Sequence, residues 1–459
     1  MKKNDVYTVE ITDITNLGFG VAKIDGIVVF VGGAVTGDVA RVKIIKLQAS
    51  FAVARVEEIL TPSTLRASEP RCSVTGCQSC AYREIEYSAE LGIKEGLVRH
   101  AFIKEGLDTP IADIIGSPSV HEYRNKAQYP ISKNAKGEYV IGFYKPKSHV
   151  VCEAANCPLA PRIFSEILEV LRAYFKRHSL SVYDEESGEG LLRHVYLRRG
   201  EVSGEILLTL VLTEASLPHS DELVTAIREK FPSVVGMLIN INDRRTNVIL
   251  GERYVTLYGR DYIFDTLSGV RLKLTAPSFY QVNHGAAQLL YAKARELAAL
   301  RSGDTLLDLY CGVGSIGLSM AKDAGELIGI EIVPSAALCA SENAAASGIK
   351  NAKFFAGDAA NAEELLASAQ AALGKKIEPD VIVLDPPRAG CDERLLKFIS
   401  SLSAQRIVYI SCNPATLARD VRILSRLGFA AGEVTPVDLF PGTGHVESVV
   451  CLTRSDKAT

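Results

Sequence analysis

The feature that most constrains this chain is a regular alternation of strand-like and helix-like segments in its last third. Six apolar runs of strand character follow one another there, and helix-forming segments separate them. The runs are DTLLDLYCG, GELIGIEI, AKFFAGD, DVIVLDPP, QRIVYISC and VESVVCLT. This alternation predicts a doubly wound α/β sheet with ligands at the carboxyl ends of its strands. We therefore expect a Rossmann-like domain over residues 266–459.

The rest of the chain predicts two further domains. Residues 1–60 contain short β-rich runs separated by glycines, which predict a small OB-like β-barrel. Residues 61–265 mix strands such as EILLTLVL with amphipathic helices near 162–177 and 219–230, so we expect an α+β domain. A length of 459 residues is consistent with about three domains.

Composition excludes several other classes of protein. Apolar residues make up 47% of the chain and charged residues 23%, which excludes a mainly disordered protein. No run approaches the roughly 18 apolar residues of a membrane-spanning helix, and the start MKKNDVYTVEITD lacks the apolar stretch of a signal peptide. We therefore expect a cytoplasmic protein with no membrane partner. Because the formal charge is −3, nucleic-acid binding would need a local basic patch.

A glycine-rich turn and two acidic residues indicate a nucleotide site. Gly312 and Gly314 begin a G-x-G-x-x-G motif that leads from a strand into a helix, and such a turn allows close approach of a nucleotide. Glu331 ends the next strand, where it can accept hydrogen bonds from both ribose hydroxyls. These residues do not distinguish NAD from S-adenosylmethionine. Asp385, in LDPPR at the end of the fourth strand, favours the latter, because an acid-Pro-Pro unit there is typical of nucleobase methyltransferases.

A cysteine and a glutamate lie at two further strand ends. Cys412, in ISCNP, precedes a helix expected from about Ala415. The positive end of a helix lowers the pKa of a thiol, so Cys412 is a candidate nucleophile. The segment LFPGTGHVESVV places His445 and Glu447 before the last strand, where either could act as a general base. Without further information this loop reads as a surface hairpin with a solvated acid.

Taken together, these motifs resemble those of one family. The segments DLYCGVGSIGL, LDPPRAG, SCNPATLARD and PGTGHVES are similar to motifs of the S-adenosylmethionine-dependent RNA uracil-5-methyltransferases. The resemblance covers nearly the whole chain. It is strongest for the bacterial 23S rRNA (uracil-5-)-methyltransferases, which carry an N-terminal TRAM domain and a [4Fe–4S] cluster. It implies a TRAM domain at residues 1–60, a central iron–sulfur domain at 61–265 and a catalytic methyltransferase domain at 266–459.

The resemblance also implies residue roles. Cys412 would be the nucleophile that adds to C6 of uracil, and Glu447 would be the base that removes the C5 proton. The implied product is 5-methyluridine in RNA, and the TRAM domain and cluster cysteines favour 23S rRNA over tRNA. With the glycines of the turn, the expected cofactor contacts are Gln281, Tyr310, Gly312, Gly314, Glu331, Asp358 and Asp385.

Three cysteines crowd one short segment near the start of the central domain. Cys72, Cys77 and Cys80 offer three thiolates, which with a distant fourth suit either zinc or a [4Fe–4S] cluster. The spacing alone does not choose between these groups. The resemblance implies the cluster and makes Cys157 the fourth ligand, although Cys152 is a neighbour that could replace it. The first spacing is one residue shorter than the family commonly shows.

A basic, aromatic-rich segment predicts where RNA would bind. Residues 121–150 hold six Lys or Arg against two Glu, with five Tyr or Phe among them. Cations suit phosphates and aromatic faces suit unstacked bases. A second basic stretch adds Arg193, His194, Arg198 and Arg199. We expect a monomer that binds RNA and not DNA. Two alternatives remain: a non-catalytic RNA-binding assembly factor and a nicotinamide-dependent oxidoreductase.

Overall fold

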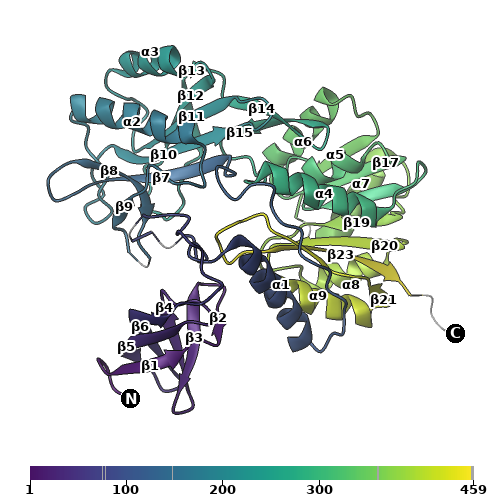
Figure 1. Ribbon diagram of the computed structural model, residues 1–459. Helices are drawn as coiled ribbons and strands as arrows, with labels where there is room; N and C mark the ends of the chain where they lie inside the picture. The colour runs from purple at the N-terminus through teal and green to yellow at the C-terminus, as the bar shows by residue number, and fades with distance from the viewer. Residues whose placement is uncertain (75, 78, 147, 359–360, 456–459) are drawn as a thin grey trace.

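The computed structural model describes residues 1–74, 76–77, 79–146, 148–358 and 361–455. Figure 1 shows three sheets in chain order: a small N-terminal sheet, a central sheet, and a C-terminal sheet enclosed by helices. Within the described residues, no helix has the length and apolar character needed to cross a membrane.

The N-terminal sheet is a curled half-barrel of six strands in the order β1-β5-β6-β4-β3-β2. Every neighbouring pair is antiparallel except β4 and β6. Alternate residues such as Val29 and Val31 point into its core. No ladder joins β1 to β2 in this fully described stretch, so the expected barrel is not closed. The strands are β1 (Val6–Glu10), β2 (Asp13–Ile14), β3 (Phe19–Ile24), β4 (Ile27–Gly32), β5 (Val39–Leu47) and β6 (Phe51–Thr61).

The segment after this sheet ends in a helix that packs far from its sequence neighbours. Helix α1 (Tyr87–Lys104) lies beside α9 (Pro414–Arg426), as Figure 1 shows. Its residues Val98 and Phe102 are buried in the core of the C-terminal sheet. Helix α1 therefore forms part of the covering of the last sheet.

The central sheet has seven strands in the order β13-β12-β11-β10-β7-β8-β9, and only β11 and β12 are parallel. Helices α2 (Arg162–Arg177) and α3 (Ser220–Lys230) pack on it and confirm the two helices expected there. The strands are β7 (Lys126–Lys133), β8 (Tyr139–Tyr144), β9 (Val151–Glu153), β10 (Leu192–Arg199), β11 (Ile206–Leu212), β12 (Val234–Ile241) and β13 (Arg253–Gly259).

Three of the aromatic side chains expected to face RNA are buried, whereas several of the lysines of the same segment are exposed. Tyr129 and Tyr139 belong to the core of the central sheet and present no free face for a base. Arg198 is fully buried and donates to the carbonyl of Ser278, while Arg193 donates to the carbonyl of Asn242 at 2.7 Å. The prediction of a second basic stretch was therefore wrong for Arg193 and Arg198, because these cations satisfy buried carbonyls, and for half-buried Arg199 it stays a prediction.

The C-terminal sheet confirms the predicted doubly wound α/β fold. Its order is β18-β17-β16-β19-β20-β23-β21, with β22 paired to β23, and the first five strands are parallel. The chain runs outward in both directions from β16, so the carboxyl ends of β16 and β19 border a crevice. The strands are β16 (Thr305–Leu309), β17 (Glu326–Glu331), β18 (Ala352–Ala356), β19 (Val381–Leu384), β20 (Arg406–Ser411), β21 (Phe429–Ala431), β22 (Thr435–Val437) and β23 (Glu447–Arg454).

Helices cover both faces of this sheet. One core contains residues of α4, α5 and α6 together with the hairpin of β14 and β15, and the other contains residues of α1, α7, α8 and α9. The elements not yet given are β14 (Tyr262–Leu267), β15 (Val270–Thr275), α4 (His284–Ala298), α5 (Ser315–Met320), α6 (Pro334–Ala346), α7 (Ala362–Leu373) and α8 (Glu393–Ser401).

Candidate active site

The parallel register aligns three of the predicted side chains at one edge of the C-terminal sheet. Leu309 pairs with Ile330 on one side and with Leu384 on the other. The next residues along these strands are Tyr310, Glu331 and Asp385. Since the carboxyl ends of parallel strands meet at one edge, these three residues border the same crevice.

The turn after β16 adopts a backbone that favours glycine. Gly312 has φ +56° and Gly314 has φ +83°, and a Cβ on Gly314 would lie 2.9 Å from Leu318 Cδ1. Tyr310 has φ +66°, an uncommon value for a residue with a side chain, and such strain is concentrated at functional sites. The turn is thus built for close approach of a ligand.

Glu331 is fixed beside this turn by backbone donors. The Gly312 N–H donates to Glu331 Oε2 at 2.8 Å, and the Val333 N–H donates to Oε1 at 2.9 Å. A carboxylate offers about four lone-pair sites, so both oxygens can still accept from a pair of hydroxyls. The sequence prediction for Glu331 agrees with this geometry.

Asp308 is a buried carboxyl group that our sequence analysis missed. It lies on β16, is fully buried, and accepts from the Gly317 N–H at 3.0 Å through Oδ2. Its Oδ1 has no hydrogen-bond partner among the described residues. Burial, with smaller contributions from Asp385 and Glu331, raises its pKa to about 8. An aspartate inside the apolar run LLDLY was the signal that could have revealed it.

Gln281 and Asp358 lie at the two sides of the same region. Gln281 is buried just before α4, and its carbonyl accepts from Asn125 Nδ2 of the central region at 2.8 Å. Asp358 is exposed after β18, and its charge helps raise the pKa of Tyr310, although burial is the main cause. Asp358 therefore lies close to the crevice residue Tyr310, whereas the role of Gln281 at the cofactor stays a prediction.

Cys412 and Glu447 stand opposite each other on adjacent strands. In the antiparallel pair of β20 and β23, Ser411 is the partner of Ser448. Cys412 follows directly after β20 and Glu447 precedes Ser448 on β23, so the register continued by one residue places them across from each other. Directly opposed residues have Cβ atoms about 4.5–5.5 Å apart. Glu447 is 4% exposed, whereas Cys412 is half-buried.

The electrostatics at this position correct one expectation. Burial raises the pKa of Cys412 to about 11, and the charges of Glu447 and Asp385 add to this, while Arg388 lowers it. The expected lowering by the helix terminus is therefore wrong, because desolvation and two carboxylates outweigh it. Burial likewise raises the pKa of Glu447 to about 8 and that of Asp385 to about 7.

Arg388 links three of the sequence motifs around Cys412. Its Nη2 lies 2.6 Å from His445 Nδ1, and its carbonyl accepts from Asn413 Nδ2 at 3.0 Å. Burial, followed by the Arg388 charge, lowers the pKa of His445 to about 4. A neutral imidazole accepts this hydrogen bond, so His445 orients Arg388 and leaves Glu447 as the candidate base.

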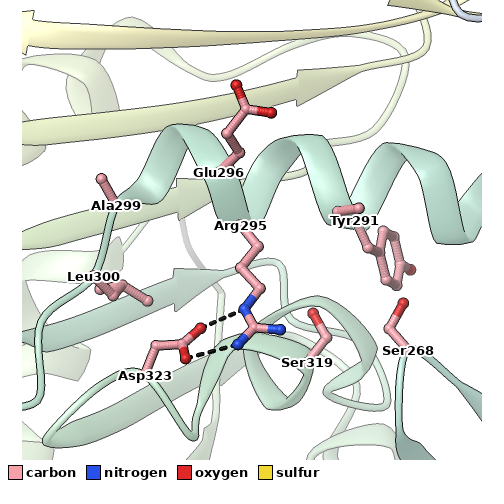
Figure 2. A pocket seen from close by; sticks show the side chains of 9 residues that line it. Ser268, Tyr291, Arg295, Glu296, Ala299, Leu300, Ser319 and Asp323 are labelled. Atoms are coloured by element: carbon pink, nitrogen blue, oxygen red, sulfur yellow. Dashed lines mark hydrogen bonds and ion pairs between the residues drawn. The ribbon is translucent and has the colours of Figure 1, made fainter.

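A pocket of about 600 Å³ lies behind this site and contains none of the predicted side chains. Figure 2 shows Tyr291 at one end of it, Ala299 and Leu300 at the other, and the paired Arg295 and Asp323 between them. The hydroxyls of Tyr291 and Ser315 lie 2.9 Å apart, and the charges of Asp385, Asp308 and Glu447 act on Tyr291. Tyr291 thus separates this pocket from the acidic crevice.

The predicted metal-ligand cysteines lie near one another without forming a ready metal site. The charges of Cys157, Cys77 and Cys72 all act on Cys80, whose pKa burial raises to about 12. In the part of the chain that the structure describes, no group of three or more His, Cys, Asp or Glu is arranged to hold a metal ion. Residues 75 and 78 of this loop lie outside the described residues.

Comparison with known proteins places the chain in a family. A model described as tRNA (Uracil-5-)-methyltransferase matches residues 86–455. The chain belongs to this family. A TRAM domain model matches residues 2–56, so the curled N-terminal sheet is a TRAM domain.

Relatives match along their whole length. A protein of Clostridium acetobutylicum described as an uncharacterized RNA methyltransferase is 39% identical over 462 residues, covering 100% of this chain and 99% of its own. One of Bacillus cereus is 38% identical over 460 residues, with 100% and 98% covered. The crystal structure of Pyrococcus abyssi tRNA (uracil-54, C5)-methyltransferase with S-adenosyl-L-homocysteine has a TM-score of 0.78 and 26% identity, covering 97% of this chain and 100% of its own.

The residues of the crevice fit S-adenosylmethionine, the methyl donor of this family. Glu331 can accept from ribose hydroxyls beside a turn open to a ligand at Gly312, where a Cβ would meet nothing within 4 Å. The Oδ1 of buried Asp308 is an acceptor without a donor among the described residues. An adenosine-containing ligand with an amino group and a positive sulfonium suits this acidic lining.

Proposed function

We propose that this protein transfers a methyl group from S-adenosylmethionine to C5 of a uridine in RNA through a covalent bond between Cys412 Sγ and uracil C6. The observation that carries the proposal is the strand register that sets Cys412 opposite Glu447. A non-catalytic RNA-binding factor would have no need for a thiol and a buried, unpaired carboxyl group at this edge.

The arrangement suits the chemistry of uracil. C5 of uracil is a weak nucleophile, and addition of a thiolate at C6 converts the ring to an enolate with an electron-rich C5. S-adenosylmethionine, when bound, supplies the methyl group. Glu447 then accepts the C5 proton, the C5–C6 double bond re-forms, and Cys412 leaves as thiolate.

The pKa values of the site define what its residues must do. With a pKa of about 11, the Cys412 thiol is mostly protonated near neutral pH, so it must lose its proton as it attacks. Asp385, whose pKa burial raises to about 7, is the acceptor for that proton, which leaves the Glu447 carboxylate for the C5 proton. Glu447, with a pKa raised to about 8, is a strong enough base to take the C5 proton.

Trapping of the adduct tests this assignment. Cys412→Ala should bind RNA and form neither adduct nor product. Glu447→Gln should form the adduct and transfer methyl, then remain as a covalent protein–RNA complex on a denaturing gel. Methylation by Cys412→Ala, or a trapped complex that maps to a cysteine other than Cys412, would show that the roles are wrong.

The RNA substrate we propose is 23S rRNA, on the resemblance described above. The structural similarity to a tRNA (uracil-54, C5)-methyltransferase makes tRNA the second candidate. Mapping 5-methyluridine in rRNA and tRNA from cells with and without the gene separates the two. Loss confined to tRNA would overturn the rRNA assignment and leave the chemistry intact.

We also propose a [4Fe–4S] cluster held by Cys72, Cys77, Cys80 and Cys157. Arg124 supports a negatively charged group there: the charges of Cys157 and Cys80 act on its guanidinium, and its buried Nε has no partner among the described residues. A set of four thiolates around iron would supply that partner charge.

Metal analysis tests the cluster. Anaerobically purified protein should be brown and contain iron and sulfide, and Cys77→Ser should lose both. Cys152→Ser is the matched control and should keep them, because Cys152 Sγ already donates to the Phe143 carbonyl at 3.1 Å. Stoichiometric zinc without iron would contradict the assignment.

A further inference from the structure

Four charged side chains from three distant segments form a buried network beside the candidate active site. Lys94 Nζ lies 2.7 Å from Glu90 Oε1 and 2.7 Å from Asp438 Oδ1, and Arg71 pairs with the other oxygen of Glu90. The side chains of Lys94, Glu90 and Asp438 are fully buried. The network joins the cysteine segment, helix α1 and the loop that follows β22.

The network also holds the backbone of that loop, residues 438–446, which we call the base loop. Lys94 Nζ donates to the Phe440 carbonyl at 3.0 Å, and Glu90 Oε1 accepts from the Gly442 N–H at 2.7 Å. Asp438 Oδ1 accepts from the Phe440 N–H at 3.0 Å. The network thus satisfies backbone groups at two points of the loop, Phe440 and Gly442.

The base loop connects the network directly to Glu447. Val437 on β22 is the register partner of Glu447 on β23, and Asp438 is the residue after Val437. The loop between them returns to Glu447 through His445, which lies 2.6 Å from Arg388. A shift of the backbone at Asp438 or Phe440 would therefore move the strand pair that carries Glu447.

Stability alone does not account for four buried charges. Taking ions out of water costs several kcal/mol each, and well-packed apolar residues of similar volume are often equally or more stabilising. Buried ion pairs serve instead to specify one arrangement in some proteins. Here Lys94 and Glu90 both form hydrogen bonds with the backbone of the base loop, and Lys94 also pairs with Asp438, the first residue of that loop.

We propose that Lys94 and Glu90 are positioning residues that hold the base loop so that the Glu447 carboxylate meets the C5 proton of the methylated uridine. The proposal rests on the function proposed above. Cys412 lies between β20 and α9, and among the described residues no hydrogen bond or ion pair joins the side chains of the network to either element. Loss of the network should therefore slow the release of methylated RNA much more than formation of the adduct.

Single-turnover measurements on the full-length, cofactor-saturated protein with methylatable RNA test this. Lys94→Met keeps the length of the side chain without its charge, and Glu90→Gln keeps its shape. In both variants we expect adduct formation within about twofold of the native rate. We expect product release at least about tenfold slower, with the covalent complex accumulating on denaturing gels. Because Glu90→Gln is the milder change, it provides the test if Lys94→Met does not fold.

Arg99→Met is the matched control, since Arg99 lies on the same helix and, among the described residues, pairs with Glu95 alone, at 3.0 Å on the surface. It should leave both steps unchanged. Equal slowing of adduct formation and release in the network variants, or release at the native rate, would overturn the positioning role. Glu447→Gln measured in parallel separates the two proposals: if it traps no adduct, the proposed function fails, whereas trapping there without slowing in Glu90→Gln rejects only the network's role.

Discussion

The base loop begins and ends with buried carboxyl groups whose surroundings differ. Asp438 at its start is fully buried and pairs with Lys94. Glu447, just after its end, is 4% exposed and forms no ion pair among the described residues. Burial and the charge of Asp385 raise the pKa of Glu447 to about 8. The paired carboxylate fixes the chain, and the unpaired one is free to exchange a proton near neutral pH.

The largest expected effect comes from removing Lys94, the cation that pairs with Asp438 at the start of the base loop. Lys94→Met leaves Glu90 and Asp438 sharing the single charge of Arg71 in a buried site. Removing one partner of a buried ion pair costs about 3–5 kcal/mol. We expect the free energy of unfolding to fall by about that amount in urea titrations followed by circular dichroism.

A charge-balanced variant sharpens this result. Lys94→Met combined with Asp438→Asn removes one charge of each sign, and it should recover more than half of the lost stability. Arg99→Met should stay within about 0.5 kcal/mol of the native protein, as for most exposed pairs. If Lys94→Met cost less than about 1 kcal/mol, the two ends of the loop would not differ in the way we describe.

Glu331 is a third carboxylate, and its surroundings are intermediate between those of Asp438 and Glu447. Its substitution should have the next largest effect. Glu331 is half-buried and is held by two backbone N–H groups in place of a cation. Glu331→Ala would leave ribose hydroxyls without acceptors, so S-adenosylmethionine should bind about 1–3 kcal/mol more weakly in calorimetry.

Glu342 supplies the control for that measurement. It lies on α6 and pairs with Lys273 at 2.9 Å on the surface, so Glu342→Ala should leave the affinity unchanged. Native affinity in Glu331→Ala would remove Glu331 from the cofactor site. Tight binding of NAD with none of S-adenosylmethionine would contradict the nucleotide assignment as a whole.

Some of these features could be predicted from the sequence and others could not. Strand–helix alternation and the G-x-G-x-x-G turn were enough to predict the last sheet and the positions of Glu331 and Asp385, because those signals are local. Glu447 was identified through family resemblance, since its loop alone reads as a surface hairpin. Whether it faces Cys412 depends on the register of β20 with β23, which the structure supplies.

The network around Lys94 was beyond the reach of local patterns. Lys94 and Asp438 are 344 residues apart, and only packing of α1 on the C-terminal core brings them together. Their charges read in sequence as ordinary solvated residues. The same holds for the aromatic residues of segment 121–150, whose alternation with lysines suggested an exposed face. In the sheet, Tyr129 and Tyr139 instead point into the core.

The pKa of the Glu447 carboxyl group differs between the folded and the unfolded protein. The folded protein keeps this carboxyl group protonated up to about pH 8, whereas the ordinary value is 4.5. Between these values the folded state binds more protons than the unfolded state, so stability falls as pH rises from about 4.5 to about 8 and levels off above. Glu447→Gln should lose this part of the slope and, at pH 8, exceed native stability by at least about 1 kcal/mol.

Asp385 sets the background against which that difference must be read. Burial raises its pKa to about 7 from 3.8, so it contributes a slope of the same sign over a lower pH range and persists in Glu447→Gln. The free energies of unfolding of the native protein and of Glu447→Gln should therefore differ most between about pH 7 and pH 8 and become similar near about pH 5. Suppose instead that the free energies of unfolding of the two proteins, measured in urea, ran parallel across this pH range. That result would mean that Glu447 is ionised in the folded protein. The contrast between Glu447, without an ion pair among the described residues, and the ion-paired Asp438 would then not hold.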